Sequence, residues 1–258
     1  MTHSERLDNL DLICRYLLDE HPQYHSAAVP HSMEEKQRLM RSLLNIRPPR
    51  PVHDGFIAAQ DAELKVQISE KGIIEPSGSG LIEWQGDITR LKVDAIVNAA
   101  NSQMLGCFVP MHRCIDNAIH SAAGVQLRLA CADMMRDREE PAGRARITPG
   151  FNLPSRFVLH TAGPIVSTAR PFRTQEAQLS SCYRSCLELA AEKGLESIAF
   201  CCISTGEFRF PNDLACRIAV GTVRSWMSSH PTSSVKTVIF NTFKDLDHEL
   251  YQDTLAEG

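Results

Sequence analysis

The sequence has no excess of basic residues and no long apolar segment. Its 27 lysines and arginines are outnumbered by 31 aspartates and glutamates, which gives a formal net charge of −4 at pH 7. A protein that binds long nucleic acid usually carries a concentrated basic surface, so we expect no such partner. No stretch approaches the roughly 20 apolar residues of a membrane span, and the first residues lack the charged, apolar and small-residue order of a signal peptide. We therefore expect a cytoplasmic protein with no membrane partner.

The sequence also lacks the cysteine pattern of a disulfide-stabilised secreted domain. Its nine cysteines are odd in number and scattered along the chain, and thiols in a reducing compartment serve as core residues, metal ligands or nucleophiles. Those that fall within predicted helices or strands are expected in the core: Cys131, Cys182, Cys186, Cys201, Cys202 and Cys216. Cys107 and Cys114 fall in a loop with His112 between them and require another explanation.

The chain divides into two parts with different patterns. In residues 1–75, apolar residues follow helical spacing in three segments. We expect Ser4 to cap the first helix, and the second to begin at Ser32 with a capping-box pattern and to stop before Pro48. After a joint rich in Pro, Ser and Gly, short apolar runs alternate with helical stretches. The expected strands are 80–86, 94–100, 156–162, 197–203 and 235–240, and the expected helices are 114–134, 175–193 and 212–229.

This alternation is typical of a sheet covered by helices. Runs such as residues 198–203 are apolar throughout rather than at every second position, which indicates strands buried on both faces. The expected fold for residues 76–258 is therefore α/β, with three α/β/α layers around a mixed, mostly parallel central sheet. An N-terminal helical region over residues 1–75 precedes it.

Polar and small residues follow three of the predicted strands. In open α/β sheets, ligands bind at the carboxyl ends of the strands, so these residues are candidates for a binding site. The Asp87 carboxylate can accept a hydrogen bond from an exocyclic amine, and the Asn101 amide can donate to and accept from sugar hydroxyls. Backbone amides over residues 204–208, ahead of a predicted helix, can cradle a diphosphate.

The loop ahead of the predicted helix 114–134 gathers two thiols and an imidazole. Cys107, His112 and Cys114 have Cys-x4-His-x-Cys spacing, which can close around one ion, with Pro110 stiffening the middle of the loop. Three such ligands are typical of catalytic zinc, because a fourth position stays open for water or substrate, whereas structural zinc normally takes four. We therefore expect one Zn²⁺ at this loop.

Two further polar features lie near this loop. Asp116 and His120 are four residues apart on the predicted helix, a spacing that suits a mutual hydrogen bond, within the helix or in support of the site. His160 ends a predicted strand, and we expect it to be a hydrogen-bonded structural residue rather than a metal ligand.

Four segments together resemble a known family, the macrodomain, a three-layer α/β/α module whose family ligand is ADP-ribose. The segments are residues 86–89, 98–101, 152–164 and 203–211, and the resemblance covers about residues 76–250. It implies that Asp87 contacts the adenine amine, Ile88 the adenine edge and Asn101 the distal ribose. It also implies that the diphosphate and distal ribose contact Ser204, Thr205, Gly206, Glu207 and Phe208. Arg209 departs from the family pattern, because most macrodomains have glycine there.

The Cys-His-Cys loop stands where ordinary macrodomains have a glycine-rich loop. Together with the N-terminal helical region, it is similar to the zinc-dependent macrodomains of microbes, which remove ADP-ribose from modified proteins. This resemblance implies a zinc-dependent hydrolase that removes mono-ADP-ribose from protein side chains, through an aspartate, glutamate or related linkage. Its partners are then ADP-ribose and a mono-ADP-ribosylated protein. In this mechanism Asn101 orients the ribose, and Asp116 steers the water or a zinc ligand.

Two alternatives remain open from the sequence. One is a non-catalytic module that binds ADP-ribose and uses zinc only to staple the loop. The other is a deacetylase of O-acetyl-ADP-ribose. No feature of the sequence indicates an oligomeric state or identifies the modified protein.

Overall fold

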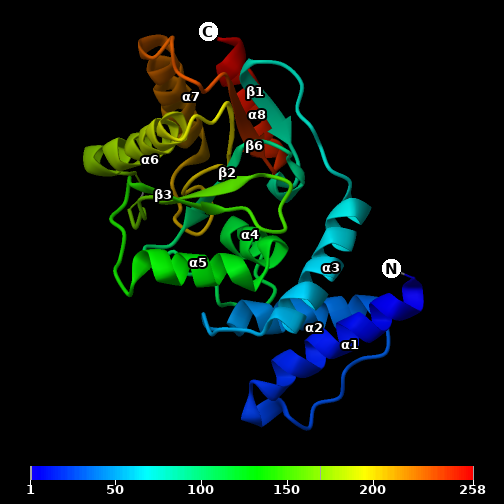
Figure 1. Ribbon diagram of the computed structural model, residues 1–258. Helices are drawn as coiled ribbons and strands as arrows, with labels where there is room; N and C mark the ends of the chain where they lie inside the picture. Colours follow the sequence, from blue (N-terminus) through cyan, green and yellow to red (C-terminus); the bar gives the residue numbers. More distant parts are fainter. Residues whose placement is uncertain (1, 169, 258) are drawn as a thin grey trace.

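The computed structural model describes residues 2–168 and 170–257 and has three α/β/α layers (Figure 1). Within these residues one six-stranded sheet has the order β1-β6-β5-β2-β4-β3, and all neighbours are parallel except β3, which runs antiparallel to β4. The strands are β1 (Gly80–Gln85), β2 (Ala95–Ala100), β3 (Ala145–Pro149), β4 (Phe157–Ala162), β5 (Ser197–Phe200) and β6 (Thr237–Thr242). The expected α/β fold with a mixed sheet is confirmed.

Helices cover both faces of the sheet. In Figure 1, α4 and α5 lie on one face, and α6 and α7 lie on the other. The helices are α1 (His3–Asp19), α2 (Met33–Ile46), α3 (Asp54–Lys71), α4 (Ile115–Ala123), α5 (Val125–Met135), α6 (Arg173–Glu192), α7 (Asn212–Ser229) and α8 (Asp245–Ala256). None of the helices described is both long and apolar enough to cross a membrane.

The central strands are buried because each has a strand on either side and a helical layer on each face. Ile96 and Val97 of β2 and Ile198 and Ala199 of β5 are fully buried, as their continuous apolar runs predict. The edge strand β1 is only partly buried along its length. The core therefore lies along β2, β5 and β6, and the carboxyl ends of these strands open toward one side of the sheet.

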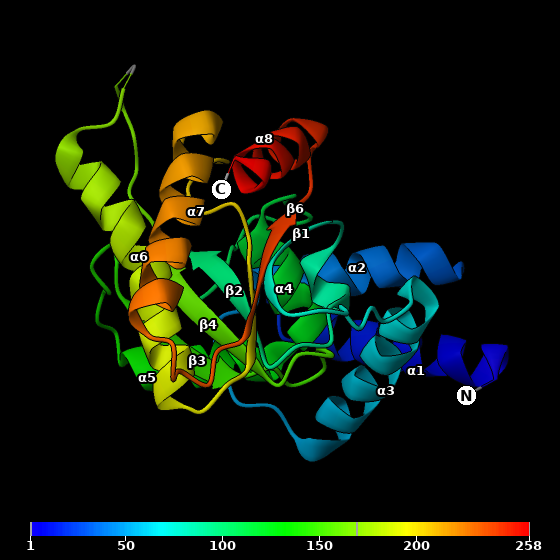
Figure 2. The same ribbon diagram turned by 90° about the horizontal axis from the view of Figure 1, so that it is seen from above.

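The three N-terminal helices build a second, smaller core beside the sheet. Leu10, Leu17, Met40 and Phe56 pack in one cluster, which also includes Val125 of α5. Figure 2 shows α1 to α3 grouped beside α4, away from α6 and α7. The helical region therefore touches the same side of the α/β part that carries the loop before α4. The division at residues 75 and 76 stays a prediction.

Several expectations about element ends are wrong. Thr2, not Ser4, caps α1, because the Thr2 side chain accepts from the Glu5 N–H while the Glu5 carboxylate accepts from the Thr2 N–H. The expected helix 114–134 breaks at Gly124, which has a φ of 92° and lies against Gln60. The strand expected at 197–203 ends at Phe200, and β3 and α8 were not expected at all.

Candidate active site

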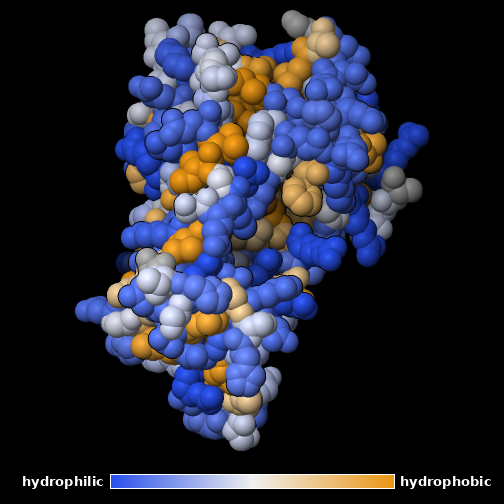
Figure 3. All heavy atoms as spheres, turned by 90° about the vertical axis from the view of Figure 1, so that its right-hand side faces the viewer, coloured by the Kyte–Doolittle hydropathy of each residue, from blue (hydrophilic) through white to orange (hydrophobic). Residues whose placement is uncertain are grey.

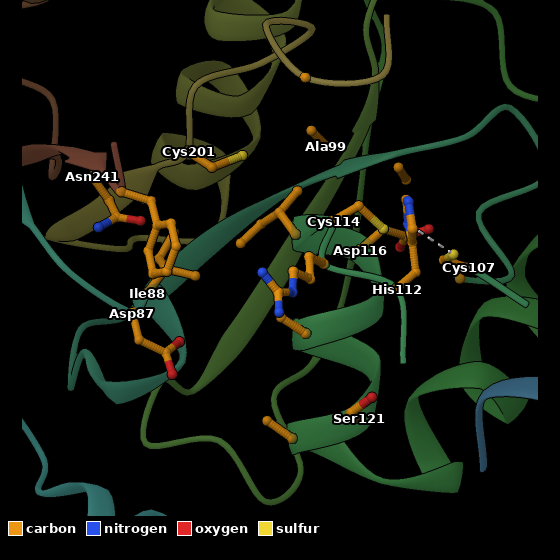
Figure 4. Close-up of a pocket in the computed structure, with 18 of the residues that line it drawn as sticks. Asp87, Ile88, Ala99, Cys107, His112, Cys114, Asp116, Ser121, Cys201 and Asn241 are labelled. Carbon is orange, nitrogen blue, oxygen red and sulfur yellow. Dashed lines mark hydrogen bonds between the residues drawn. The ribbon is translucent and has the colours of Figure 1, made fainter. Parts of the chain in front are cut away.

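A cavity of about 960 Å³ lies at the carboxyl ends of the parallel strands. This volume suits a ligand of nucleotide size. All of the candidate site residues line it: Asp87, Ile88, Asn101, Cys107, His112, Cys114, Asp116, Ser204, Thr205, Gly206, Glu207 and Phe208. Figure 4 shows Asp87 and Ile88 at one end and Cys107, His112 and Cys114 at the other. The residues expected to bind the nucleotide and those expected to bind the metal thus line the same elongated cavity.

Asp87 follows β1 and caps the 3₁₀ turn formed by residues 88–90. Its carboxylate accepts hydrogen bonds from the Thr89 backbone N–H at 3.0 Å and from the Thr89 hydroxyl at 2.6 Å, and Lys71 of α3 donates to it at 3.0 Å. Burial opposes ionisation, but the bonds from Thr89 and the charge of Lys71 outweigh it and lower the pKa of Asp87. Asp87 is therefore a hydrogen-bond acceptor at neutral pH.

Two residues near Asp87 were missed by sequence reasoning. Phe243 directly follows β6, lines the cavity and is 75% exposed, so its ring face is free for a flat ligand. Sequence reasoning could have found Phe243, because it directly follows a strand that pairs with β1. Asn241 of β6 holds the turn before Asp87, because its amide donates to the Gly86 carbonyl at 2.9 Å.

The loop of residues 204–210 is held in a tight conformation. Ser204 and Arg209 have φ values of 66° and 58°, in the left-handed region, and the Phe210 N–H donates to the Ser204 carbonyl at 2.9 Å. Gly163 packs closely beneath the loop, since a Cβ there would come 2.0 Å from the Ser204 Oγ. Arg209 therefore occupies a backbone conformation that glycine adopts at little steric cost.

The Cys-His-Cys cluster fits a zinc ion. The candidate donor atoms of Cys107, His112 and Cys114 all lie within 4.8 Å of one another, and Cys107 Sγ is 3.6 Å from His112 Nδ1. In tetrahedral zinc, bonds of about 2.3 Å to sulfur and about 2.0–2.1 Å to nitrogen place the two ligand atoms about 3.6 Å apart. Cys114 also caps α4, where its Sγ accepts from the Asn117 N–H at 3.4 Å.

Asp116 lies in the first turn of α4, at the floor of the cavity. Its side chain is buried and accepts from the Asn98 amide at 2.8 Å. Burial raises the pKa of the Asp116 carboxyl to about 6, although Asn98 and the charge of Arg128 oppose this. Asp116 Oδ1 lies 3.5 Å from His120 Nε2, but the expected hydrogen bond between them is not formed. The hydrogen bond from Asn98 satisfies this oxygen instead.

A second cluster of donor atoms lies beneath the cavity and consists of His120, Cys131 and His160, all buried. The nitrogens of His160 already have partners, since the Asn98 amide donates to Nδ1 at 3.2 Å and Nε2 lies 2.9 Å from the Thr148 hydroxyl. Burial lowers the pKa of His160 to about 3, so the ring is neutral. His160 therefore has the hydrogen-bonded structural place expected for it, whereas neither ring nitrogen of His120 has a hydrogen-bond partner.

Asn101 closes the turn that leads into the Cys-His-Cys loop of residues 107–114. Its Oδ1 accepts from the Met104 N–H at 3.0 Å, and its Nδ2 donates to the Gly106 carbonyl at 3.3 Å. Asn101 also lines the cavity. Its role at a ribose stays a prediction.

Comparison with known proteins identifies the family. The profile of the Macro domain family matches residues 97–219. A relative named protein-ADP-ribose hydrolase from Treponema medium is 48% identical, and the aligned region covers 99% of this chain and 100% of that protein. A protein of the same name from Staphylococcus aureus strain MRSA252 is 47% identical over 87% of this chain and 86% of its own length.

Solved structures give the same result. The Oceanobacillus iheyensis macrodomain with ADP has a TM-score of 0.61 and 38% identity, covering 68% of this chain and 89% of that one. The Trypanosoma brucei macrodomain in complex with ADP-ribose has a TM-score of 0.60 and 29% identity, and it covers 94% of this chain and 86% of that one. The chain therefore belongs to the macrodomain family, among relatives that carry the name protein-ADP-ribose hydrolase.

Proposed function

We propose that this protein is a hydrolase that releases ADP-ribose from mono-ADP-ribosylated protein side chains and uses one Zn²⁺ held by Cys107, His112 and Cys114. One observation carries the proposal: the three donor side chains face the same cavity as the loops suited to a nucleotide. The full-length relative at 48% identity, named protein-ADP-ribose hydrolase, supports the same activity.

The cavity offers a partner for each part of ADP-ribose. The Asp87 carboxylate accepts from the adenine amine, and the exposed ring of Phe243 stacks on the base. The backbone of residues 204–208 holds the diphosphate, and Asn101 contacts the distal ribose. Binding energy from the nucleotide then positions the bond between the ribose anomeric carbon and the protein side chain beside the metal ligands.

Zinc supplies, when bound, a Lewis acid with an open fourth position that binds a ribose hydroxyl or a water and lowers the pKa of such a water to about 7. The chain contributes a positioned carboxylate next to it. Asp116 is two residues from Cys114 and is oriented by Asn98. Its carboxylate can therefore hold a water or a ribose hydroxyl by accepting a hydrogen bond from it. We assign Asp116 this orienting role in the reaction.

The proposed substrates are proteins with ADP-ribose on aspartate, glutamate or a related acceptor. A module that only binds ADP-ribose needs no open metal position, whereas a zinc ion held by only three protein donors at this cavity would keep a fourth position for water or substrate. This difference favours hydrolysis over binding alone.

The test measures release of ADP-ribose from an aspartate- or glutamate-linked ADP-ribosylated protein. The purified protein is assayed as isolated, after chelation and after zinc is returned, with the fold followed by circular dichroism. We expect release that is lost on chelation and recovers with zinc while the fold persists. Release unaffected by chelation would refute zinc dependence. Intact ADP-ribose binding without release from any linkage would identify a binding module, and turnover of O-acetyl-ADP-ribose alone would identify a deacetylase.

A further inference from the structure

The Cys-His-Cys loop is held from outside by side chains of the N-terminal helix α2. Asn45, near the end of α2, is 1% exposed. Its Oδ1 accepts from the Met111 N–H at 2.9 Å, and its Nδ2 donates to the Ser121 hydroxyl of α4 at 2.9 Å. Met111 has a φ of 56°, a conformation that residues other than glycine rarely adopt. Asn45 therefore holds the backbone of Met111, which lies between the ligands Cys107 and His112, in this unfavourable conformation.

Arg41, one turn earlier on α2, reaches the metal ligands themselves. Its guanidinium donates to the His112 carbonyl at 3.3 Å and to Asn117 Oδ1 at 2.8 Å. Asn117 in turn donates its amide to the Val109 carbonyl at 3.0 Å and its backbone N–H to Cys114 Sγ at 3.4 Å. One arginine of α2 thus contacts the backbone of one ligand and the side chain of Asn117, the residue whose backbone N–H donates to the sulfur of another ligand.

A second arginine links the end of α2 to the start of the loop. Arg128 of α5 is 5% exposed and donates to the Leu105 carbonyl at 2.7 Å and to the Cys107 carbonyl at 3.4 Å. The same guanidinium donates to three carbonyls at the end of α2, those of Leu44, Asn45 and Arg47. The Phe108 ring covers it, with the guanidinium carbon 4.3 Å from the ring centroid. The end of α2 and the loop backbone are therefore held by one buried cation.

We propose that α2 is a positioning part of the metal site, in which Arg41 and Asn45 hold residues 107–114 in the form that binds the ion. The inference rests on the proposed function only in taking zinc at Cys107, His112 and Cys114 as the bound ion. Hydrogen bonds to the residues around metal ligands fix the ligand orientation and raise metal affinity. A loop already held in the binding conformation also loses less conformational entropy when the ion binds.

The hydrogen bonds from α2 to the loop give the N-terminal helices a role beyond their apolar packing against α5. Those helices also supply Lys71, the partner of Asp87 at the opposite end of the cavity. The helical region therefore contacts both ends of the site, and α2 acts at the metal end.

The experiment compares Arg41→Ala, Arg41→Lys and Asn45→Ala with the wild type in the 258-residue chain. Arg38→Ala is the matched control, because Arg38 is an exposed arginine on the same helix. Zinc affinity is measured by competition with a chromogenic chelator. Co²⁺ substitution is followed through its thiolate charge-transfer and ligand-field absorption, which reports the ligand geometry directly. Thermal melting of the metal-free proteins shows that each variant is folded.

We expect Arg41→Ala and Asn45→Ala to weaken zinc binding by about 10–100-fold and to change the Co²⁺ spectrum. Arg41→Lys, which keeps a charged donor, should lose less, and Arg38→Ala should match the wild type. If Arg41→Ala does not fold, Arg41→Lys and Asn45→Ala decide the question.

Wild-type zinc affinity and an unchanged Co²⁺ spectrum in the folded Arg41 and Asn45 variants would overturn the inference and leave the proposed hydrolase intact. A wild-type protein that binds no zinc would overturn both. Weakened zinc binding in the variants, with no hydrolysis by the wild type, would support the inference and refute the proposed function.

Discussion

We expect Asp116 to lower the stability of the metal-free fold at neutral pH, so that replacing it with asparagine makes the protein more stable. Its carboxyl is buried and accepts from the Asn98 amide. Asparagine has nearly the same shape, and its own carbonyl oxygen can accept the same hydrogen bond. Asp116→Asn therefore removes a buried charge while it keeps the contact.

The magnitude follows from the pKa of Asp116. Burial raises it from 3.8 to about 6 in the folded protein. At about 1.4 kcal/mol per pKa unit, this difference corresponds to about 3 kcal/mol at pH 7. The sign follows from proton binding: the folded state holds the proton more tightly, so stability is highest below pH 4 and is lost as pH rises through about 6. The variant lacks this titration.

Urea denaturation of the chelated proteins at pH 7 and near pH 4.5 tests the reasoning. We expect Asp116→Asn to be about 2–3 kcal/mol more stable than the wild type at pH 7, and the advantage to shrink at the lower pH. The same variant should release ADP-ribose more slowly, because the orienting carboxylate is gone. A variant less stable than the wild type at pH 7, or an advantage that grows on acidification, would refute the account of the buried charge.

Three further changes test other parts of the site. Gly163→Ala places a Cβ 2.0 Å from the Ser204 Oγ and 2.9 Å from the Ile203 Cγ2, so it should displace residues 203–208, weaken ADP-ribose binding in calorimetry and cost about 1–3 kcal/mol in denaturation; an unchanged affinity would contradict the packing. Arg209→Gly relieves a φ of 58° and should stabilise the fold by about 0.5–1 kcal/mol, measured as a higher melting temperature; a lower one would contradict strain at this residue. Lys71→Met removes a cation that lowers the pKa of Asp87, so ADP-ribose binding should fail at a higher pH on acidification than in the wild type; coincident pH profiles would show that Lys71 has no such effect.

Much of the site could be predicted because parallel strands bring their carboxyl ends to one edge of a sheet. Asp87 follows β1 and Asn101 follows β2, and both line the cavity although they are separated in the sequence. The metal cluster was equally visible, since Cys107, His112 and Cys114 lie close in sequence and need only one loop to meet. Local spacing and strand order carry these predictions.

Other residues of the site could not be predicted, because they depend on packing between distant segments. Arg41 and Lys71 enter the site only because the N-terminal helices lie against the loop before α4 and the turn after β1. Gln60 of α3 also contributes to the break at Gly124, since its Oε1 accepts from the Val125 N–H at 2.9 Å and its amide lies where a Cβ of residue 124 would be. On the face shown in Figure 3, hydrophobic side chains form separate patches among hydrophilic ones.

An interaction with zinc bound at the neighbouring cysteines would explain why the chain has a destabilising carboxylate at Asp116. Asp116 lies two residues from Cys114, and because two thiolates would cancel the charge of a bound zinc ion, the metal can favour the ionised form of Asp116 only through short-range contact, such as a hydrogen bond from a group that the ion holds. The pKa of Asp116 should then fall, and the stability advantage of Asp116→Asn should shrink in the zinc-loaded protein. Denaturation of both proteins with and without zinc completes a thermodynamic cycle whose coupling free energy measures the interaction. An advantage of equal size in both states would show that Asp116 and the metal do not interact, and its orienting role would have to be abandoned.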